Sequence, residues 1–375
     1  MLVEVSSLIC PPAVWPSPTL EGVSESLFTE EEAPRRSAGG RKVTIIVLAG
    51  AGALLLIAAA VAIIYLASLR GAYQDAVNVI PEDETFPEAE DRPERPTRTD
   101  EDGDEVEDEQ LNILLIGSDS GGGSGESENV PWLPNAGRAD TIMWMHIPHE
   151  RDSVQVMSVM RDTWVPIPGH GEAKINASMS FGGSATTVAT MEELMDVRID
   201  HVAAVDMVGF QNLVGAMEGV TVDSPVSFTS RDGHHFHGGP QSMNSTEAMS
   251  FVRERKAFDD GDFQRAANQQ ALMRGVLDEV LTPSTLTNPA RIHSMVSTFA
   301  PHMAVDSQLS DAEYVTDLGW SMREVRGGDI DMFTIDNHGL GTAGSESIIV
   351  PDYDAFSEAG EAMREGRFDE YAAEH

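Results

Sequence analysis

One uncharged stretch near the start of the chain limits how the rest of it can fold. Residues 43–69 carry no formal charge, and as an α-helix they would extend roughly 40 Å. That length crosses a hydrocarbon core of about 30 Å with some tilt. A cleaved signal peptide is the alternative, but its apolar region is usually about half as long and follows a shorter polar leader. We therefore expect one retained transmembrane helix at 43–69.

Charges on either side of this stretch predict its orientation. Arg70 is followed by an acidic region, whereas four basic residues precede the stretch, namely Arg35, Arg36, Arg41 and Lys42. Because positive charge stays on the cytoplasmic side, the N-terminus is expected in the cytoplasm. Residues 1–40 have no periodic apolar pattern and are expected to form a disordered cytoplasmic tail. The expected localisation is a single-pass protein of the cell membrane, with its main domain outside the cytoplasm.

An acidic segment separates the expected membrane helix from that domain. Between Glu82 and Glu109 there are 15 Asp and Glu residues and three arginines, with little apolar content. Such a composition repels itself and is typical of extended chain. We therefore expect residues 71–110 to form an extracytoplasmic linker that acts as a spacer.

The balance of charge excludes one class of partner. The chain has 24 Lys and Arg against 62 Asp and Glu, a net charge of −38. A general nucleic-acid binder needs a basic surface to neutralise phosphates, so no nucleic-acid partner is expected. The single cysteine, Cys10, also rules out an intramolecular disulfide and a cysteine-based zinc site.

After residue 110, short apolar runs alternate with helical patterns. Runs bounded by Gly, Pro or charges are typical of buried strands, and they lie at 111–117, 141–147, 155–159, 202–205, 220–222, 330–335 and 347–350. Apolar spacing near 3.6 predicts helices at 184–195, 208–217, 246–252, 265–281, 311–323 and 353–366. We expect an α/β (α+β-like) domain with a mixed central sheet and helices on both faces. Its main part is 111–281, and 282–375 form the C-terminal part of the same domain.

Basic residues are scarce in this domain and unevenly placed. After residue 110 there are 16 Lys and Arg against 40 Asp and Glu, and four basic residues fall within thirteen positions: Arg253, Arg255, Lys256 and Arg265. Three more, Arg138, Arg161 and Lys174, lie at the ends of predicted strands, where ligands of open α/β sheets collect. Arginines so placed favour a phosphate clamp, because a guanidinium group matches phosphate oxygens with two hydrogen bonds. Pairing with nearby carboxylates is the alternative.

Five runs of the sequence together carry a resemblance to a known family. They are LNILLIGSDS (111–120), GRADTIMWMHI (137–147), SVMRDTWVPIPGHGEAKINASMSFGG (158–183), DHVAAVDMVGFQNLVGAMEGVTVDSPVSF (200–228) and MNSTEAMSFVRERKAFDDGDFQRAANQQ (243–270). Their order and spacing resemble the LytR–CpsA–Psr family of bacterial envelope proteins, nearly continuously from Leu111 to about Leu281. Five ordered motifs are far more specific than any single one.

This resemblance implies an activity. Members of the family transfer a glycan 1-phosphate from a polyprenyl pyrophosphate carrier onto peptidoglycan and release polyprenyl phosphate. The protein expected from the resemblance is a membrane-anchored phosphotransferase that depends on Mg²⁺ or Mn²⁺, with the lipid-linked glycan, peptidoglycan and the membrane as partners. The alternatives are a hydrolase of the same lipid-linked substrates and a non-catalytic envelope scaffold or regulator that binds the carrier.

The resemblance also implies roles for individual residues. Asp119 and Asp140 match the family's metal-binding aspartates, and Mg²⁺ commonly uses one or two carboxylates beside substrate oxygens. The residues expected to bind the pyrophosphate are Arg138, Arg161, Lys174, Asn176, Arg253, Arg255, Arg265 and Gln269. Those expected to act in catalysis are Arg138, Arg161 and Asp262, and Asp262 has the alternative role of orienting the arginines beside it.

Three details stay open at this point. Arg253 and Arg255 would share one side of an extended segment, but in a continued helix they would diverge by about 200°. The polyprenyl chain needs an apolar groove, for which the candidates are Met179, Phe181, Phe210, Leu213, Val214, Met217, Met249, Phe251 and Leu272. A zinc site at His234, His235 and His237 is a weaker alternative, because no further ligand lies at a suitable spacing.

Overall fold

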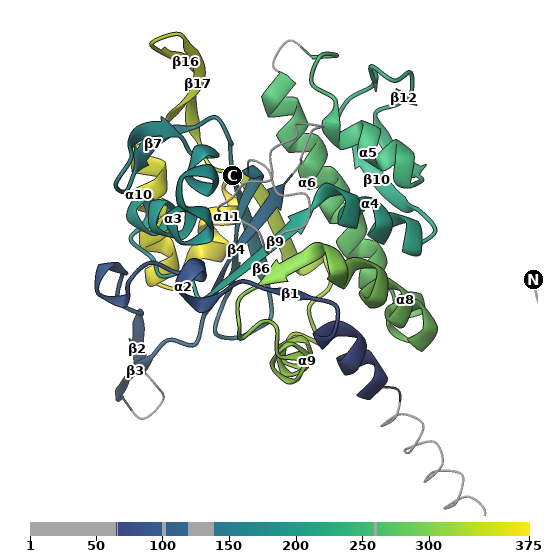
Figure 1. Cartoon of the computed structure of the whole chain (residues 1–375), viewed down its shortest axis with the longest axis horizontal. Helices are drawn as coiled ribbons and strands as arrows, with labels where there is room; N and C mark the ends of the chain where they lie inside the picture. Colours follow the sequence, from purple (N-terminus) through teal and green to yellow (C-terminus); the bar gives the residue numbers. More distant parts are fainter. Residues whose placement is uncertain (1–64, 66, 100–102, 119–138, 259–260) are drawn as a thin grey trace, which may run out of the picture. The chain divides into compact units, whose positions relative to one another are not determined.

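The structure is a computed structural model that describes residues 65, 67–99, 103–118, 139–258 and 261–375 (Figure 1). At its centre is a mixed sheet of seven strands, in the order β1 (Asn78–Val79), β14 (Met303–Val305), β9 (His201–Asp206), β4 (Leu111–Ser118), β5 (Ala139–Ile147), β6 (Val154–Val159) and β15 (Ile330–Thr334). Strand β4 is parallel to β9 and antiparallel to β5. The expected α/β fold with a mixed central sheet is confirmed.

Alternating side chains of the central strands pack on opposite faces of the sheet. Leu114 and Ile116 of β4 belong to a core beneath α3 (Ala177–Met195), α10 (Tyr353–Arg364) and α11 (Phe368–Ala373). Ile113 and Leu115 belong to a second core, which side chains of α6 (Gly261–Val280) and α9 (Ala312–Ser321) complete. Both faces of the sheet are therefore buried, which explains the continuous apolar runs in its strands.

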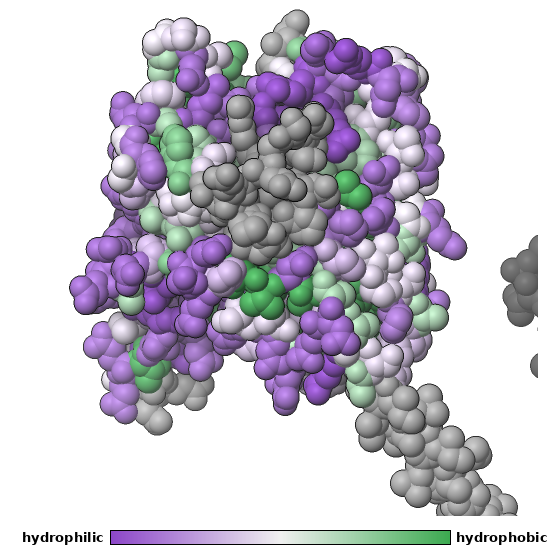
Figure 2. Space-filling view, viewed as in Figure 1, coloured by the Kyte–Doolittle hydropathy of each residue, from purple (hydrophilic) through white to green (hydrophobic). Residues whose placement is uncertain are grey.

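A third apolar core lies to one side of the sheet. It joins α4 (Met207–Ala216), α5 (Ser245–Arg253), α6 and α8 (Pro289–Phe299) with the ribbon formed by β10 (Val220–Ser224) and β13 (Gly239–Met243). Figure 1 shows these helices on the opposite side of the molecule from α3 and α10. The surface in Figure 2 is largely hydrophilic, with apolar residues only in small patches, because the apolar side chains fill these three cores.

Shorter elements decorate this frame. They are the helices α2 (Glu82–Thr85) and α7 (Pro283–Leu286), the 3₁₀ turns η1 (Ala89–Asp91), η2 (Ala300–His302) and η3 (Gly327–Asp329), and the strand pairs β2 (Thr97–Thr99) with β3 (Glu105–Glu107), β7 (Trp164–Ile167) with β8 (Gly171–Lys174), β11 (Phe228–Thr229) with β12 (His235–Phe236), and β16 (Asn337–Ala343) with β17 (Glu346–Pro351). The β7–β8 hairpin was not predicted, because its strands are four residues long. Helix α3 starts before the predicted 184–195 and bends at Gly182 and Gly183, the latter with φ of 67°.

The expected membrane helix lies almost wholly outside the described residues. Of 43–69, only residue 65 and residues 67–69 are described, in a helix that continues to Gln74. The part of the chain that the structure describes contains no helix with both the length and the apolar character needed to cross a membrane.

Three polar side chains are buried together between β4 and β5. Asn112 Oδ1 accepts a hydrogen bond from Trp144 Nε1 at 3.0 Å and lies 2.9 Å from His146 Nδ1. Burial lowers the pKa of His146 to about 3, and the charge of Arg151 contributes. The imidazole is therefore neutral, and it donates from Nδ1 because the Asn112 oxygen can only accept.

The described residues of 71–110, which are 71–99 and 103–110, contain segments attached to the domain, in contrast to the expected extended spacer. Ile80 is fully buried in the core beneath α3, and Thr85 at the end of α2 is buried as well. Further along, Arg92 reaches Glu192 of α3, which is also buried. The prediction from composition was wrong. A few apolar residues and one ion pair attach this segment to the domain, although most of its residues are charged or polar.

The ion pair between Arg92 and Glu192 is the firmest of these attachments. Arg92 donates from Nη2 at 2.7 Å and from Nε at 3.1 Å to Glu192 Oε1, and the side chains are 7% and 2% exposed. Arg92 Nη2 also donates to the carbonyl oxygen of Ile199, whose N–H donates to Glu192 Oε1 at 2.8 Å. The guanidinium lies 4.4 Å from the ring centroid of Phe86, so every side of the pair is covered.

Removing Arg92 should destabilise the whole domain. In Arg92→Met the Glu192 carboxylate stays buried without its cation, and breaking a buried pair in this way costs about 3–5 kcal/mol. The exposed Arg323, paired with Glu324, offers a matched control, and Arg323→Met should cost about 1 kcal/mol or less. Urea unfolding followed by circular dichroism measures both. Equal stability of the two variants would contradict the proposed attachment of residues 71–110.

Candidate active site

A short turn after α5 is built on one buried carboxylate. The helix begins with a capping box between Asn244 and Glu247 and ends at Arg253, after which Glu254 is extended (φ −69°, ψ 132°). Glu254 Oε2 accepts a hydrogen bond from the backbone N–H of Arg231 at 2.6 Å. Its Oε1 accepts from three successive backbone N–H groups, those of residues 255, 256 and 257, at 3.0, 2.7 and 3.0 Å. Burial alone would raise the pKa of Glu254, but these hydrogen bonds outweigh it and lower the pKa.

This turn brings Arg253 and Arg255 to one cavity. Of the two geometries that the sequence left open, the structure has the extended one, since the helix stops before Glu254. The cavity has a volume of about 240 Å³ and is called here the arginine cavity. It is lined by Asp140, Arg161, Met207, Val252, Arg253, Arg255, Arg265 and Gln269.

Two carboxylates hold the guanidinium groups of the arginine cavity close together. Asp262, in the first turn of α6, accepts a hydrogen bond at Oδ2 from Arg255 Nη2 at 2.6 Å. Its Oδ1 lies 3.3 Å from Arg265 Nη2 and 3.7 Å from Arg161 Nη2. Arg161 Nη1 also donates a hydrogen bond to Asp140. The carboxylates offset repulsion between like charges, so three arginines can converge.

Burial of Arg161 and Arg265 affects the pKa of each guanidinium group and leaves one of its N–H groups without a hydrogen-bond partner among the described residues. Burial opposes the charge of Arg161, but the carboxylates of Asp140 and Asp162 outweigh it and raise the pKa of the guanidinium. Burial lowers the pKa of Arg265, and the neighbouring charge of Arg161 lowers it further. The Nε atoms of Arg161 and Arg265 are buried and donate no hydrogen bond to a described residue.

A second cavity, of about 260 Å³, lies beside the arginine cavity under the β16–β17 hairpin. We call it the hairpin cavity, and its lining is Arg161, Asp162, Lys174, Asn176, Arg255, Asp262, Leu340, Ser347, Ile348 and Ile349. Lys174 Nζ lies 3.6 Å from Asp162 Oδ1 and 3.6 Å from Glu346 Oε2. The two cavities share Arg161 and Arg255, so a ligand that spans both would contact the same guanidinium groups.

A third cavity, of about 410 Å³, is almost wholly apolar. It lies between the sheet and helices α4, α6 and α8, and its lining includes Phe210, Leu213, Leu272, Met273 and Phe299. It shares Met207, Val252 and Gln269 with the arginine cavity. An apolar cavity therefore adjoins an arginine-lined one, and Gln269 lies at their junction.

The structure brings most of the predicted site residues together. Asp119 and Arg138 lie outside the described residues. The arginine cavity collects Asp140, Arg161, Arg253, Arg255, Arg265 and Gln269, and the hairpin cavity collects Lys174, Asn176 and Asp262. Three of the nine predicted lipid-groove residues line the apolar cavity: Phe210, Leu213 and Leu272.

The other six predicted groove residues lie elsewhere. Phe181 is exposed and stacks on His170 with a centroid distance of 4.7 Å, and Met249 lines a separate cavity. The remaining four are core residues, because their side chains point into packed helices: Met179, Val214, Met217 and Phe251. The histidines 234, 235 and 237 lie on the β11–β12 hairpin, where His235 Nδ1 is 2.9 Å from the Thr229 hydroxyl. No group of three metal-ligating side chains occurs within the described ranges.

The role of Glu254 as acceptor for four backbone N–H groups was not predicted from the sequence. Glu254 stood out only as the residue between two arginines, and its partner Arg231 is 23 positions away. The sequence would have indicated the role of Glu254 only if the turn at residues 254–257 had been predicted, because the hydrogen bonds of its carboxylate go to the backbone of that turn.

Replacing Glu254 should disturb the arginines without removing their charge. Glu254→Gln weakens four hydrogen bonds to a charged acceptor, so we expect a loss of about 2 kcal/mol in folding free energy. Because the folded pKa of Glu254 is lowered, its contribution is complete above the ordinary value of 4.5 and is lost as pH falls through the lower folded value. Thermal unfolding at pH 7 and pH 4 tests this, with the exposed Glu193→Gln as the control. Equal melting temperatures for both variants at pH 7 would contradict the role.

The chain is similar in sequence to a known protein family and to several of its members. The family model described as the LytR_cpsA_psr family matches residues 82–364. A relative named polyisoprenyl-teichoic acid–peptidoglycan teichoic acid transferase TagU, from Bacillus cereus (strain AH820), is 36% identical over 180 residues, which are 48% of this chain and 55% of the relative. The TagU of Bacillus subtilis (strain 168) is 33% identical over 178 residues, 47% of this chain and 54% of the relative. The chain thus spans just over half the length of these curated relatives.

Solved structures share the fold. The crystal structure of B. subtilis TagV matches with a TM-score of 0.58 and 23% identity, covering 70% of this chain and 99% of that one. A LytR-Csp2A-Psr enzyme from Actinomyces oris matches with a TM-score of 0.54 and 18% identity, covering 72% of this chain and 93% of that one. Because the family model covers 82–364, which includes all three cavities, the chain belongs to the LytR–CpsA–Psr family.

Proposed function

We propose that this protein transfers a glycan 1-phosphate from a polyprenyl pyrophosphate carrier to peptidoglycan. One observation carries the proposal: the apolar cavity adjoins the arginine cavity, and the two share lining residues, among them Met207 and Gln269. A ligand that fits both must join a long apolar chain to a multiply charged anion. A polyprenyl pyrophosphate is such a ligand, and the relatives named as teichoic acid transferases support this choice.

In this proposal the arginine cavity holds the pyrophosphate. Arg161, Arg253, Arg255 and Arg265 supply the positive charge, because all four line this cavity. Fixed donors of this kind stabilise the charge that develops on phosphate oxygens in the transition state. Asp262 keeps Arg255 and Arg265 in place, because its Oδ2 faces Arg255 and its Oδ1 faces Arg265.

A divalent cation fits beside these residues. Asp140 lines the arginine cavity, and a carboxylate next to a phosphate-sized space is where Mg²⁺ or Mn²⁺ binds, with substrate oxygens and water as further ligands. We propose Asp140 as a ligand, together with Asp119 from the sequence resemblance. When bound, the cation neutralises phosphate charge during the transfer.

The reaction itself moves one phosphoryl group. An acceptor hydroxyl oxygen attacks the phosphorus that carries the glycan, the bond from that phosphorus to the bridging oxygen breaks, and polyprenyl phosphate leaves with the electron pair. In-line displacement places the entering and leaving oxygens on opposite sides of phosphorus. With the lipid in the apolar cavity, the hairpin cavity is on the acceptor side. Asp262 lines this cavity, and we propose that its carboxylate takes the hydroxyl proton.

The proposal also includes a membrane anchor. Such a carrier lipid is held in a bilayer, and the uncharged residues 43–69 are long enough to place the enzyme at the same membrane. The four basic residues before this stretch favour a cytoplasmic N-terminus, with the domain on the side where peptidoglycan lies.

A transfer assay with the whole chain tests the proposal. The protein is incubated with a polyprenyl-pyrophosphate disaccharide, peptidoglycan and Mg²⁺, and glycan bound covalently to peptidoglycan is measured by mass spectrometry. Met273→Trp should fill the apolar cavity and lower transfer from this donor about tenfold, while a donor with a short water-soluble chain is used normally. Met332→Trp, which faces a different cavity, is the control. Free sugar phosphate would identify a hydrolase, tight lipid binding without turnover a scaffold, and full activity in EDTA would exclude the metal.

Lysine variants separate geometry from charge at the arginine cavity. Arg161→Lys and Arg255→Lys keep the positive charge but lose the paired donors that a phosphate oxygen pair accepts. We expect kcat to fall by about 100-fold, on the scale of losing one transition-state donor. Arg274→Lys on the exposed side of α6 is the matched control and should leave kcat unchanged. If the Lys variants turn over at the rate of the unmodified protein, these arginines contribute only diffuse charge.

A further inference from the structure

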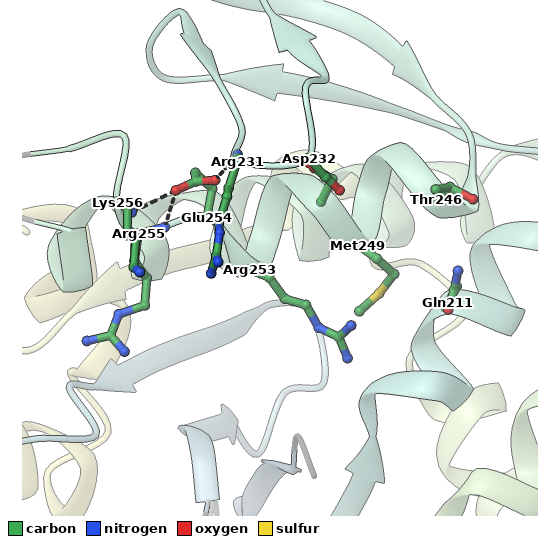
Figure 3. A pocket seen from close by; sticks show the side chains of 10 residues that line it. Gln211, Arg231, Asp232, Thr246, Met249, Arg253, Glu254, Arg255 and Lys256 are labelled. Carbon is green, nitrogen blue, oxygen red and sulfur yellow. Dashed lines mark hydrogen bonds between the residues drawn. The ribbon is translucent and has the colours of Figure 1, made fainter. Parts of the chain in front are cut away.

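A fourth cavity lies beside the turn at residues 254–257. Its volume is about 580 Å³, and it is lined by Gln211, Arg231, Asp232, Thr246, Met249, Ser250, Arg253, Glu254, Arg255 and Lys256. Figure 3 shows that the side chains of four of these extend to the same side of the turn: Arg231, Arg253, Arg255 and Lys256. We call this space the cationic cavity.

Two of the four basic residues of the cationic cavity, Arg231 and Lys256, have no ion-pair partner in the described part of the chain, whereas Arg255 is paired with Asp262. All four basic side chains are exposed. Two arginines on other surfaces, Arg291 and Arg364, have carboxylate partners in Glu279 and Asp196.

Its two carboxylates are directed elsewhere. Glu254 turns its carboxylate away from the basic side chains and onto backbone N–H groups, as Figure 3 shows. Asp232 Oδ1 accepts hydrogen bonds from the hydroxyl groups of Ser230 and Ser250, each at 2.6 Å. Glu254 and Asp232 therefore form no ion pair with Arg231 or Lys256, and basic residues in this situation in a chain of net charge −38 favour an external anion.

Two residues connect this cavity to the proposed reaction centre. Arg253 and Arg255 line both the cationic cavity and the arginine cavity. A donor whose pyrophosphate lies in the arginine cavity must lead its glycan away from the lipid and from the acceptor side. The cationic cavity is the space next to the same guanidinium groups that neither of them occupies.

We propose that the cationic cavity binds anionic repeating units of the donor glycan, with phosphate groups as its preferred charge. This inference rests on the proposed function and adds to it a selection for charged polymers. Arg231 and Lys256 are the specific contacts, because they line this cavity and neither the arginine cavity nor the hairpin cavity.

Two matched donors test the proposal with the whole chain. Both carry the same polyprenyl-pyrophosphate disaccharide, and one is extended by three glycerol-phosphate units. The double variant R231Q/K256Q should lower kcat/KM for the extended donor about tenfold, mainly through KM, since two charge–phosphate contacts are lost. The bare donor should be used within about twofold of the normal rate. The control R323Q/R326Q removes the same charge from an exposed loop after α9 and should change neither donor.

A binding measurement keeps this test independent of transfer. Fluorescence anisotropy of a labelled, lipid-free glycerol-phosphate trimer should show binding that R231Q/K256Q abolishes, that R323Q/R326Q retains and that added salt weakens. If no donor is transferred but this binding pattern holds, the proposed function fails and the cationic site stands. Equal losses on both donors, or trimer binding that does not depend on Arg231 and Lys256, would overturn the inference.

Discussion

Repulsion between guanidinium groups is the constraint on which the site depends. Arg161, Arg255 and Arg265 come from three separate elements, and they approach one another only because Asp262 and Asp140 lie among them. The carboxylates offset repulsion, but four arginines line the arginine cavity, so the cluster can form and still carries the positive charge that suits an anion. More carboxylates would fill the site with its own side chains, and fewer would push the arginines apart.

The turn at residues 254–257 is where the arginine, hairpin and cationic cavities meet. Arg255, in the turn at residues 254–257, lines the arginine cavity, the cationic cavity and the hairpin cavity. One turn of chain thus contributes to three spaces, held by a carboxylate that contacts only backbone. A site of this design changes its specificity by substitutions at Arg231 or Lys256, which leave the central arginines untouched.

Local sequence patterns predicted the strands and helices of the fold. Features that depend on contacts between residues far apart in the sequence were not predicted. The strands and helices around Leu114 and Leu272 follow from apolar spacing, because both faces of the sheet are buried. Clustered arginines near predicted strand ends indicated the arginine cavity, helped by a family resemblance. Glu254 was missed because its partner Arg231 lies far away in the sequence. The segment 71–110 was misjudged for the same reason, since the partner of Arg92 is 100 positions distant.

The buried imidazole of His146 gives the domain a sensitivity to acid. In the unfolded chain His146 takes up a proton below its ordinary pKa of 6.5. In the folded chain it stays neutral down to about pH 3. Each pH unit in that interval therefore removes about 1.4 kcal/mol of folding free energy. His146 pairs with Asn112 in the β4–β5 ladder, whereas Thr141, beside Asp140, pairs with Gly117 near the other end of β4. Acidification thus weakens the fold from within its core, at the end of the sheet remote from the arginine cavity.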